Sequence, residues 1–125
     1  MIRRLTLPVL LLAALGANAQ DAVLSDGDKY RTSLDNARVR VLEYRDLPGE
    51  STHQHQHPAF VVVALSPFKR KLHLADGRTL VREFKVGDVI YSDGETHIGE
   101  NMGTTPTHVI LVELKGEPAR PAVRN

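Results

Sequence analysis

The chain contains no cysteine among its 125 residues. A disulfide therefore cannot stabilise it, and its stability has to come from packing, a bound metal or oligomerisation. No cluster of lysine and arginine interleaved with aromatic residues is present, so the usual sequence signature of nucleic-acid binding is missing. The sequence also lacks a Gly-rich phosphate loop and the strand-turn-helix pattern around a reactive serine, which argues against nucleotide binding and serine hydrolysis.

An apolar run of signal-peptide length lies near the start of the chain. Residues 1–19 combine a short basic start, an apolar run at 5–15 and an Ala17-Asn18-Ala19 cleavage site. The run is too short to cross a bilayer and is interrupted by a proline. We therefore expect a signal peptide at 1–19, a mature periplasmic or secreted chain that begins at Gln20, and no membrane attachment after cleavage. Cleavage removes two arginines and changes the formal net charge from +1 to −1.

The rest of the chain has the length of one domain. We divide it into an N-terminal extension at 20–35, a compact domain at 36–115 and a disordered tail at 116–125, where two prolines lie among charged residues. Residues 21–28 are polar and predict a loop.

Strand patterns follow one another along the compact domain. Strict alternation around Val39 and Val41 predicts a half-buried strand, and the apolar, β-branched run at 59–65 predicts a strand buried on both faces. The predicted strands are 29–34, 39–44, 59–65, 68–74, 79–84, 89–91, 97–102 and 107–114. Because proline and glycine recur and no convincing helical period appears in the mature chain, this order predicts an all-β sandwich or barrel.

Histidines form the most informative pattern. His53, His55 and His57 alternate with glutamines, and alternate residues of a strand project from the same face. His97 could meet them from a second strand. Imidazole nitrogen suits Zn, Fe, Mn, Ni and Cu, so the pattern predicts a divalent transition-metal site inside a small β-barrel.

The region 39–114 resembles the cupin superfamily. The start of the first cupin motif is matched by Gly49, His55 and His57, and the second motif is matched by Gly87, Gly94, His97 and Asn101. The resemblance implies a cupin jelly-roll barrel, also called a double-stranded β-helix, with a metal ion held by His55, His57 and His97. It also implies a small-molecule ligand or substrate and, together with the exposed edges of a small barrel, a homodimer.

The chain departs from the cupin pattern at one ligand. Where the superfamily usually has a glutamate, this sequence has Val61 and Val62, and the loss of a carboxylate should weaken the binding of hard divalent ions. His53 could replace the missing ligand. Alternatively, the site could resemble the three-histidine site of the thiol dioxygenase branch, or the barrel could carry no metal.

Other polar residues have weaker predicted roles. Asn101 could hold the loop near the ligands by bonding to backbone, whereas Tyr91 could reach the cavity or pack in the core. His73 lies among lysines and predicts a solvated face, and His108 could point inward near a strand end. The acids that could serve as a base or a further ligand are Glu95, Glu100 and Glu113.

Two functions fit this sequence. In the first, the metal acts as a Lewis acid or O2-binding centre in a dioxygenase, isomerase or lyase reaction on a small polar molecule. In the second, the barrel binds a small molecule or a partner without turnover. A cupin fold alone does not choose between them, since function resides in the site.

Overall fold

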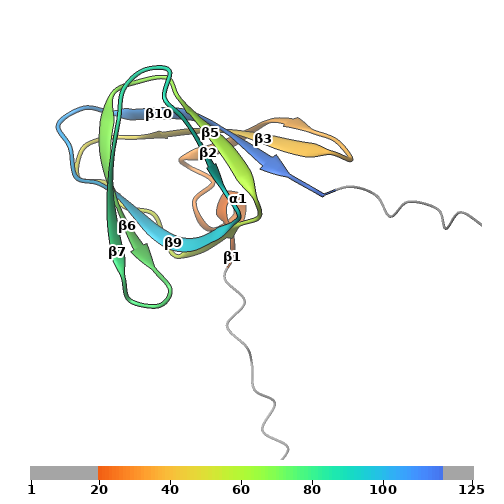
Figure 1. The fold of residues 1–125 in the computed structure, drawn as a ribbon, viewed down its shortest axis with the longest axis horizontal. Coiled ribbons are helices and arrows are strands. Elements are labelled where there is room, and N and C mark those ends of the chain that lie inside the picture. Colours follow the sequence, from red (N-terminus) through yellow and green to blue (C-terminus); the bar gives the residue numbers. More distant parts are fainter. Residues whose placement is uncertain (1–19, 117–125) are drawn as a thin grey trace, which may run out of the picture.

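The computed structural model describes residues 20–116, which form two five-stranded sheets that face each other (Figure 1). The first sheet has the strand order β1-β4-β9-β6-β7 and the second has the order β2-β3-β10-β5-β8. The predicted signal peptide at 1–19 and the end of the predicted tail at 117–125 lie outside the described residues. No helix in the described part of the chain is long and apolar enough to span a membrane.

The elements are short, and most of the strands lie close to the bounds predicted from the sequence. Their bounds are β1 Gln20–Asp21, α1 Ala22–Ser25, β2 Tyr30–Asp35, β3 Val39–Asp46, β4 His55–His57, β5 Phe60–Ala64, β6 Phe68–Leu74, β7 Thr79–Phe84, β8 Val89–Ser92, β9 Glu95–Asn101 and β10 Thr107–Leu114. The loop predicted at 21–28 is interrupted by the single helical turn α1, where Asp21 accepts a hydrogen bond from the Val23 N–H at 2.9 Å and caps the turn.

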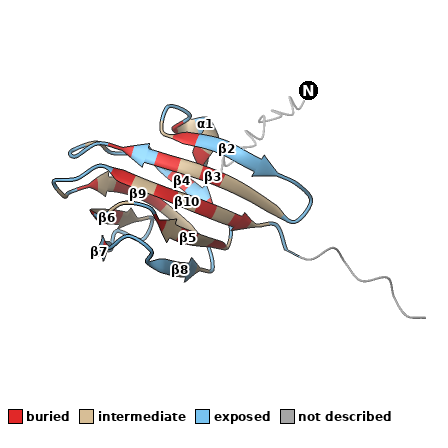
Figure 2. Cartoon of the chain, turned by 90° about the horizontal axis from the view of Figure 1, so that it is seen from above, coloured by how far each residue is buried: buried red, intermediate tan, exposed pale blue. Residues whose placement is uncertain are grey.

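The second sheet shows why alternation places one face in the core. Along β10 every second residue is buried, and Leu111 lies in register with Leu42 of β3 and Val62 of β5. Figure 2 shows the same alternation as red and tan bands along β10. The run at 59–65 was predicted to be buried on both faces, and this is wrong. Only Phe60, Val62 and Ala64 are buried there, because the other face of β5 is covered by no further layer.

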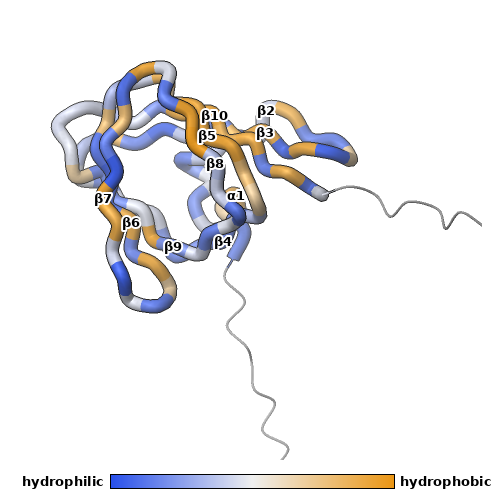
Figure 3. Tube along the Cα trace, in the orientation of Figure 1, coloured by the Kyte–Doolittle hydropathy of each residue, from blue (hydrophilic) through white to orange (hydrophobic). Residues whose placement is uncertain are grey.

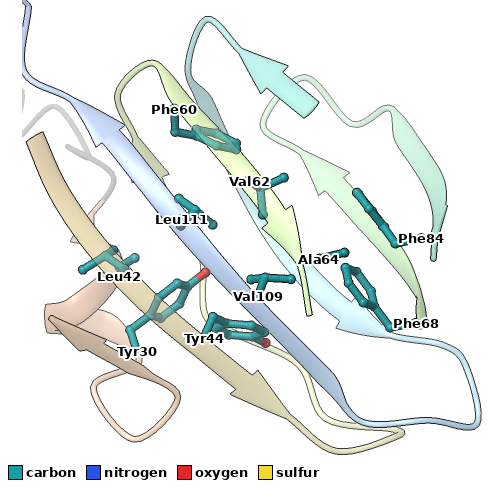
Figure 4. Close-up of a cluster of buried hydrophobic side chains, with 11 residues drawn as sticks. Tyr30, Leu42, Tyr44, Phe60, Val62, Ala64, Phe68, Phe84, Val109 and Leu111 are labelled. Atoms are coloured by element: carbon teal, nitrogen blue, oxygen red, sulfur yellow. The ribbon is translucent and has the colours of Figure 1, made fainter. Parts of the chain in front are cut away.

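The hydrophobic core lies between the two sheets. Apolar residues concentrate on β5 and β10 in Figure 3, and Figure 4 shows the core side chains directed into the space that β3, β5, β6, β7 and β10 surround. Phe68 and Phe84 stack with ring centroids 4.5 Å apart. Each fully buried side chain of this size contributes about 1.5–3 kcal/mol, so this core is the main source of stability in a chain without disulfides.

The first sheet positions the polar residues of the barrel interior. In the antiparallel pairing of β4 and β9, His55 lies directly opposite His97, and on the other side of β9 Gly99 pairs with Leu72 and Asn101 pairs with Arg70. Gly94 lies in the turn just before β9 and has a φ of +125°. A side chain at Gly94 would be strained and would lie 3.2 Å from the His57 carbonyl oxygen.

The segment that we separated as an N-terminal extension packs against the barrel. β1 pairs with β4 in parallel, with Gln20 opposite His55, and β2 pairs with β3. Residues 20–35 therefore border the histidine strand, and two of their side chains, Asp26 and Tyr30, reach it.

Candidate metal centre

Three buried histidines converge at one end of the first sheet. His55 and His57 project inward from β4, and His97 does so from β9. Their exposed fractions are 0%, 1% and 5%. One ring nitrogen from each residue lies within 4.8 Å of the other two, a separation that a single bound ion can bridge.

Hydrogen bonds indicate which nitrogen of each ring carries the hydrogen. The Nδ1 atoms of His55, His57 and His97 lie 2.9 Å from the His53 carbonyl oxygen, 2.8 Å from Glu113 Oε1 and 2.9 Å from Glu95 Oε2, respectively. Carbonyl and carboxylate oxygens only accept, so each Nδ1 carries the hydrogen and donates it. In a neutral ring the Nε2 lone pair is then available, which is the state that metal ligation requires.

A carboxylate stands behind each imidazole. Glu113 and Glu95 accept directly from His57 and His97, and Asp26 Oδ2 lies 3.4 Å from His55 Nδ1. Carboxylates in this position orient a ligating imidazole and make it more basic. The negative charge near the candidate site therefore comes from carboxylates that contact the Nδ1 side of the rings, and no carboxylate is among the three candidate ligands.

Burial disfavours the charged form of two of the imidazoles, His55 and His97. It lowers the pKa of His55 to about 4, helped by the neighbouring His57 and His97, and it lowers the pKa of His97 despite the hydrogen bond to Glu95. Burial alone would raise the pKa of Glu113, but hydrogen bonds from His57 and Arg40 outweigh it and leave that pKa below its usual range. At neutral pH, His55 and His97 are thus neutral and Glu113 is ionised.

Tyr30 is a member of the site that the sequence did not reveal. Its hydroxyl lies 3.3 Å from His55 Nε2 and 3.4 Å from His57 Nε2. Burial raises its pKa, so the phenol stays neutral and can donate a hydrogen bond. Tyr30 belongs to a strand whose other residues are exposed, and this pattern gave no signal of a buried polar role.

His53 does not join the cluster. The prediction that all three alternating histidines share a face is wrong, because β4 begins at His55 and the side chain of His53 is 82% exposed. Its Nδ1 lies 3.0 Å from Asp26 Oδ1 instead. His53 contributes to the site through its carbonyl oxygen, which accepts from His55.

The remaining predicted residues lie around the cluster. Asn101 is buried and donates to Asp46 Oδ1 at 3.0 Å and to the Thr105 carbonyl oxygen at 2.9 Å, so it holds the turn after β9. His73 and His108 are partly exposed and lie 3.2 Å from Glu100 and 3.0 Å from Glu43. The inward orientation considered for His108 is wrong, since the inward positions of β10 are its odd-numbered residues.

A cavity of about 60 Å³ opens beside the cluster. Its wall includes His57, His97 and Val62, so at the predicted position of the glutamate ligand the chain presents an apolar side chain to the cavity. Tyr91 is 60% exposed and takes no part in the wall. A cavity of this size has room for a few water molecules or a very small ligand.

No family sequence model and no curated protein sequence matches the chain. A cupin domain from Bordetella pertussis Tohama I matches its structure with a TM-score of 0.64 at 25% identity, over 81% of this chain and 100% of that one. An RmlC-like cupin family protein from Methanocaldococcus jannaschii has a TM-score of 0.56 at 14% identity, over 68% and 77% of the two chains. The polyketide cyclase RemF from Streptomyces resistomycificus has a TM-score of 0.52 at 24% identity, over 77% and 70%.

The chain therefore has the all-β cupin fold, the double-stranded β-helix, and the predicted fold class is confirmed. The donor set also fits a metal. Three imidazoles with oriented Nε2 atoms, each near a carboxylate, could hold a divalent transition ion.

Proposed function

We propose that the chain binds one divalent transition-metal ion, Fe, Mn, Ni, Zn or Cu, through the Nε2 atoms of His55, His57 and His97. One observation carries the proposal: in all three rings an oxygen engages the Nδ1 hydrogen, so the Nε2 atoms are the ones that can ligate, with the Tyr30 hydroxyl 3.3 Å from that of His55 and 3.4 Å from that of His57.

Three protein ligands leave coordination positions open for a small molecule. When bound, the ion would supply Lewis-acid or O2-binding chemistry, as in a dioxygenase, isomerase or lyase reaction. The residues of the chain orient the reacting groups. Glu113 and Glu95 hold His57 and His97, Val62 presents an apolar wall to the cavity, and the Tyr30 hydroxyl lies beside the Nε2 atoms of His55 and His57.

A non-catalytic binding protein is the second candidate. The hydrogen bonds of the nearby acids favour this candidate. Glu113 accepts from His57 and Arg40, and Glu95 accepts from His97 and Arg82. The pKa of Glu95 is about 2, since these hydrogen bonds and charges outweigh the effect of its burial. An acid so firmly ionised and engaged is a poor proton acceptor.

Metal analysis of untagged protein, purified without added metal, tests the proposal. We expect one ion per chain in the unaltered protein and none in the His55→Ala/His97→Ala double variant. The matched control is His73→Ala/His108→Ala, which also removes two histidines but outside the cluster, and it should retain the ion. A metal-free protein whose unfolding temperature does not rise with Fe, Mn, Ni, Cu or Zn would overturn the proposal, since a native-state ligand must stabilise the fold.

Export and dimerisation belong to the same proposal. We propose a mature chain that begins at Gln20, lies in the periplasm or outside the cell and forms a homodimer, on the sequence arguments given above. Intact mass spectrometry of the periplasmic protein, under denaturing and native conditions, measures both properties. A full-length cytoplasmic chain or a monomeric native mass would contradict them.

A further inference from the structure

The outer face of the second sheet carries a continuous apolar surface. Its strands lie side by side in the order β2-β3-β10-β5-β8, and the residues that alternate with the buried ones point away from the core. One row of outward residues crosses all five strands in register. From β8 to β2 this row consists of Tyr91, Val61, Val112, Val41 and Leu34.

A second row lies beside the first and becomes charged at one end. From β8 to β2 it consists of Val89, Val63, Ile110, Glu43 and Arg31. We call the two rows together the outer face. No other helix or strand of residues 20–116 lies over it, since α1 packs against β1, β2 and β4 and its residue Ala22 joins the core on the inner side of the sheet (Figure 1).

The outer face leaves large hydrophobic side chains in contact with solvent. Val89 and Tyr91 are each 60% exposed and Leu34 is 50% exposed. The outward valines of β3, β5 and β10 are only partly buried, because they contact their neighbours in the sheet and no second layer. Monomeric soluble proteins rarely expose an apolar patch that crosses a whole sheet, and such a patch marks a surface for association.

The size of the outer face suits a protein partner. Its strands have four to eight residues each. A strand spacing of about 4.8 Å and a rise of about 3.4 Å per residue give the sheet a flat area of roughly 500 Å². Side chains that stand out of this plane add to the accessible area and bring it towards the about 800 Å² that each partner buries in a typical stable interface.

Charges at the two edges of the outer face favour a second copy of the chain as the partner. At the edge formed by β2 and β3, Arg31 and Arg45 have side chains that are 76% and 64% exposed, and they share the single acid Glu43. At the opposite edge, the exposed acids Asp88 and Asp93 flank β8. Because β10 is the middle strand, a two-fold axis along β10 lays the β8 edge of one copy over the β2 edge of the other. This rotation places the basic edge opposite the acidic one.

We propose that the outer face is the interface of a homodimer, in which the second sheets of two copies pack face to face about a two-fold axis along β10. The inference deepens the proposed function and rests on its homodimer, because it names the surface through which that dimer forms. It does not depend on the metal. Since the β10 strands of the two copies lie over each other, Ile110 and Val112 meet their counterparts at the centre of the interface.

A charge at this centre tests the proposal. Val112→Lys places a lysine of each copy beside the axis, where the two charges repel each other inside an apolar contact. By native mass spectrometry we expect a dimer for the unaltered mature chain and a monomer for Val112→Lys at the same concentration. Val81→Lys is the control, at a 54% exposed valine on β7 of the first sheet, and should remain a dimer. A Val112→Lys protein that stays dimeric would overturn the inference.

A thiol at the same centre gives a second test, which does not require the interface to be weakened. The chain contains no cysteine, so Ile110→Cys introduces one thiol that has no competitor. A short bis-maleimide should link most of this variant into covalent dimers, whereas Val81→Cys should stay a single chain on a denaturing gel. Equal cross-linking of the two variants would contradict the inference.

The proposals can fail separately. A dimer that survives Val112→Lys and is not cross-linked through Ile110→Cys would overturn the outer face as the interface and leave dimerisation itself intact. A monomeric unaltered chain would overturn both, whether residues 117–125 or another protein then covers the face. Neither result changes the metal content, which the metal analysis of the same preparations measures independently.

Discussion

The three imidazoles differ in how firmly their supports are held. Glu113 is 2% exposed and accepts from Arg40 at 2.6 Å as well as from His57. Glu95 is tied to Arg82 at 3.0 Å, whereas Asp26 reaches His55 only at 3.4 Å. His57 thus has the most rigid carboxylate support of the three, and this support is the best place to test the contribution of the residues behind the ligands.

We predict that Glu113→Gln lowers metal affinity about 10–100-fold, the usual effect of losing a carboxylate behind a ligating histidine. The amide keeps the shape but removes the charge that makes His57 a stronger donor. Competition with a chromophoric chelator measures the affinity. Glu100→Gln is the control, because Glu100 contacts His73 outside the cluster. Equal affinities of the two variants would contradict the prediction.

Sequence patterns anticipated the cluster better than its surroundings. Local spacing puts His55 and His57 on one strand face, and the resemblance of a second motif added His97 to them. Tyr30 meets His55 from 25 positions away in sequence, and a contact at this distance leaves no local periodicity.

At the scale of elements, the N-terminal segment is held to the barrel by one buried acid. Asp26 follows α1 and has a side chain that is 1% exposed. It accepts from the Ser25 hydroxyl at 2.8 Å and from the His53 backbone N–H at 3.1 Å. These bonds connect α1 to the residues just before β4, and so fix where the histidine strand begins.

Replacing Asp26 by alanine should lower the free energy of unfolding by about 1–3 kcal/mol, because its partners lose a charged acceptor inside the fold. Chemical denaturation of the metal-free protein gives this quantity. Asp28→Ala is the matched control, since Asp28 is 73% exposed and pairs only with the adjacent Lys29 at 2.9 Å among its close contacts. Similar losses in both variants would show that Asp26 has no special role.

The elements themselves were largely predictable, for a physical reason. β10 alternates because one face packs on the core, and the sequence shows that alternation directly. In β3 the buried residues are Leu42, Tyr44 and Asp46, whereas the alternation in the sequence marked Val39 and Val41, which are only partly buried. α1 contains four residues, too few to show a helical period, and its position depends on Asp26 and on pairing of β1 with β4. Burial on one face of β5 could not be inferred from its continuous apolar run.

At the scale of the whole molecule, the barrel is assembled from distant segments. β10 pairs with β3, placing Thr107 opposite Asp46, and β9 pairs with β4. Closing such long loops costs entropy before the contacts form, so barrels of this kind fold slowly compared with helical proteins. The histidine cluster forms only when β4 and β9 have paired, whereas His53, His55 and His57 are neighbours from the start.

The outward orientation of His53 therefore has a consequence for the order of events during folding. In the unfolded chain, His53, His55 and His57 form a local chelate that can bind an ion before the barrel exists, and an ion bound there must exchange His53 for His97. We predict that refolding with Ni²⁺ already present is slower than refolding before Ni²⁺ is added. Stopped-flow tyrosine fluorescence measures both rates, and His53→Ala should remove most of the difference. Equal rates in the unaltered protein would contradict early binding of the ion by His53, His55 and His57. Slower refolding in the presence of Ni²⁺ would favour delivery of the metal after folding.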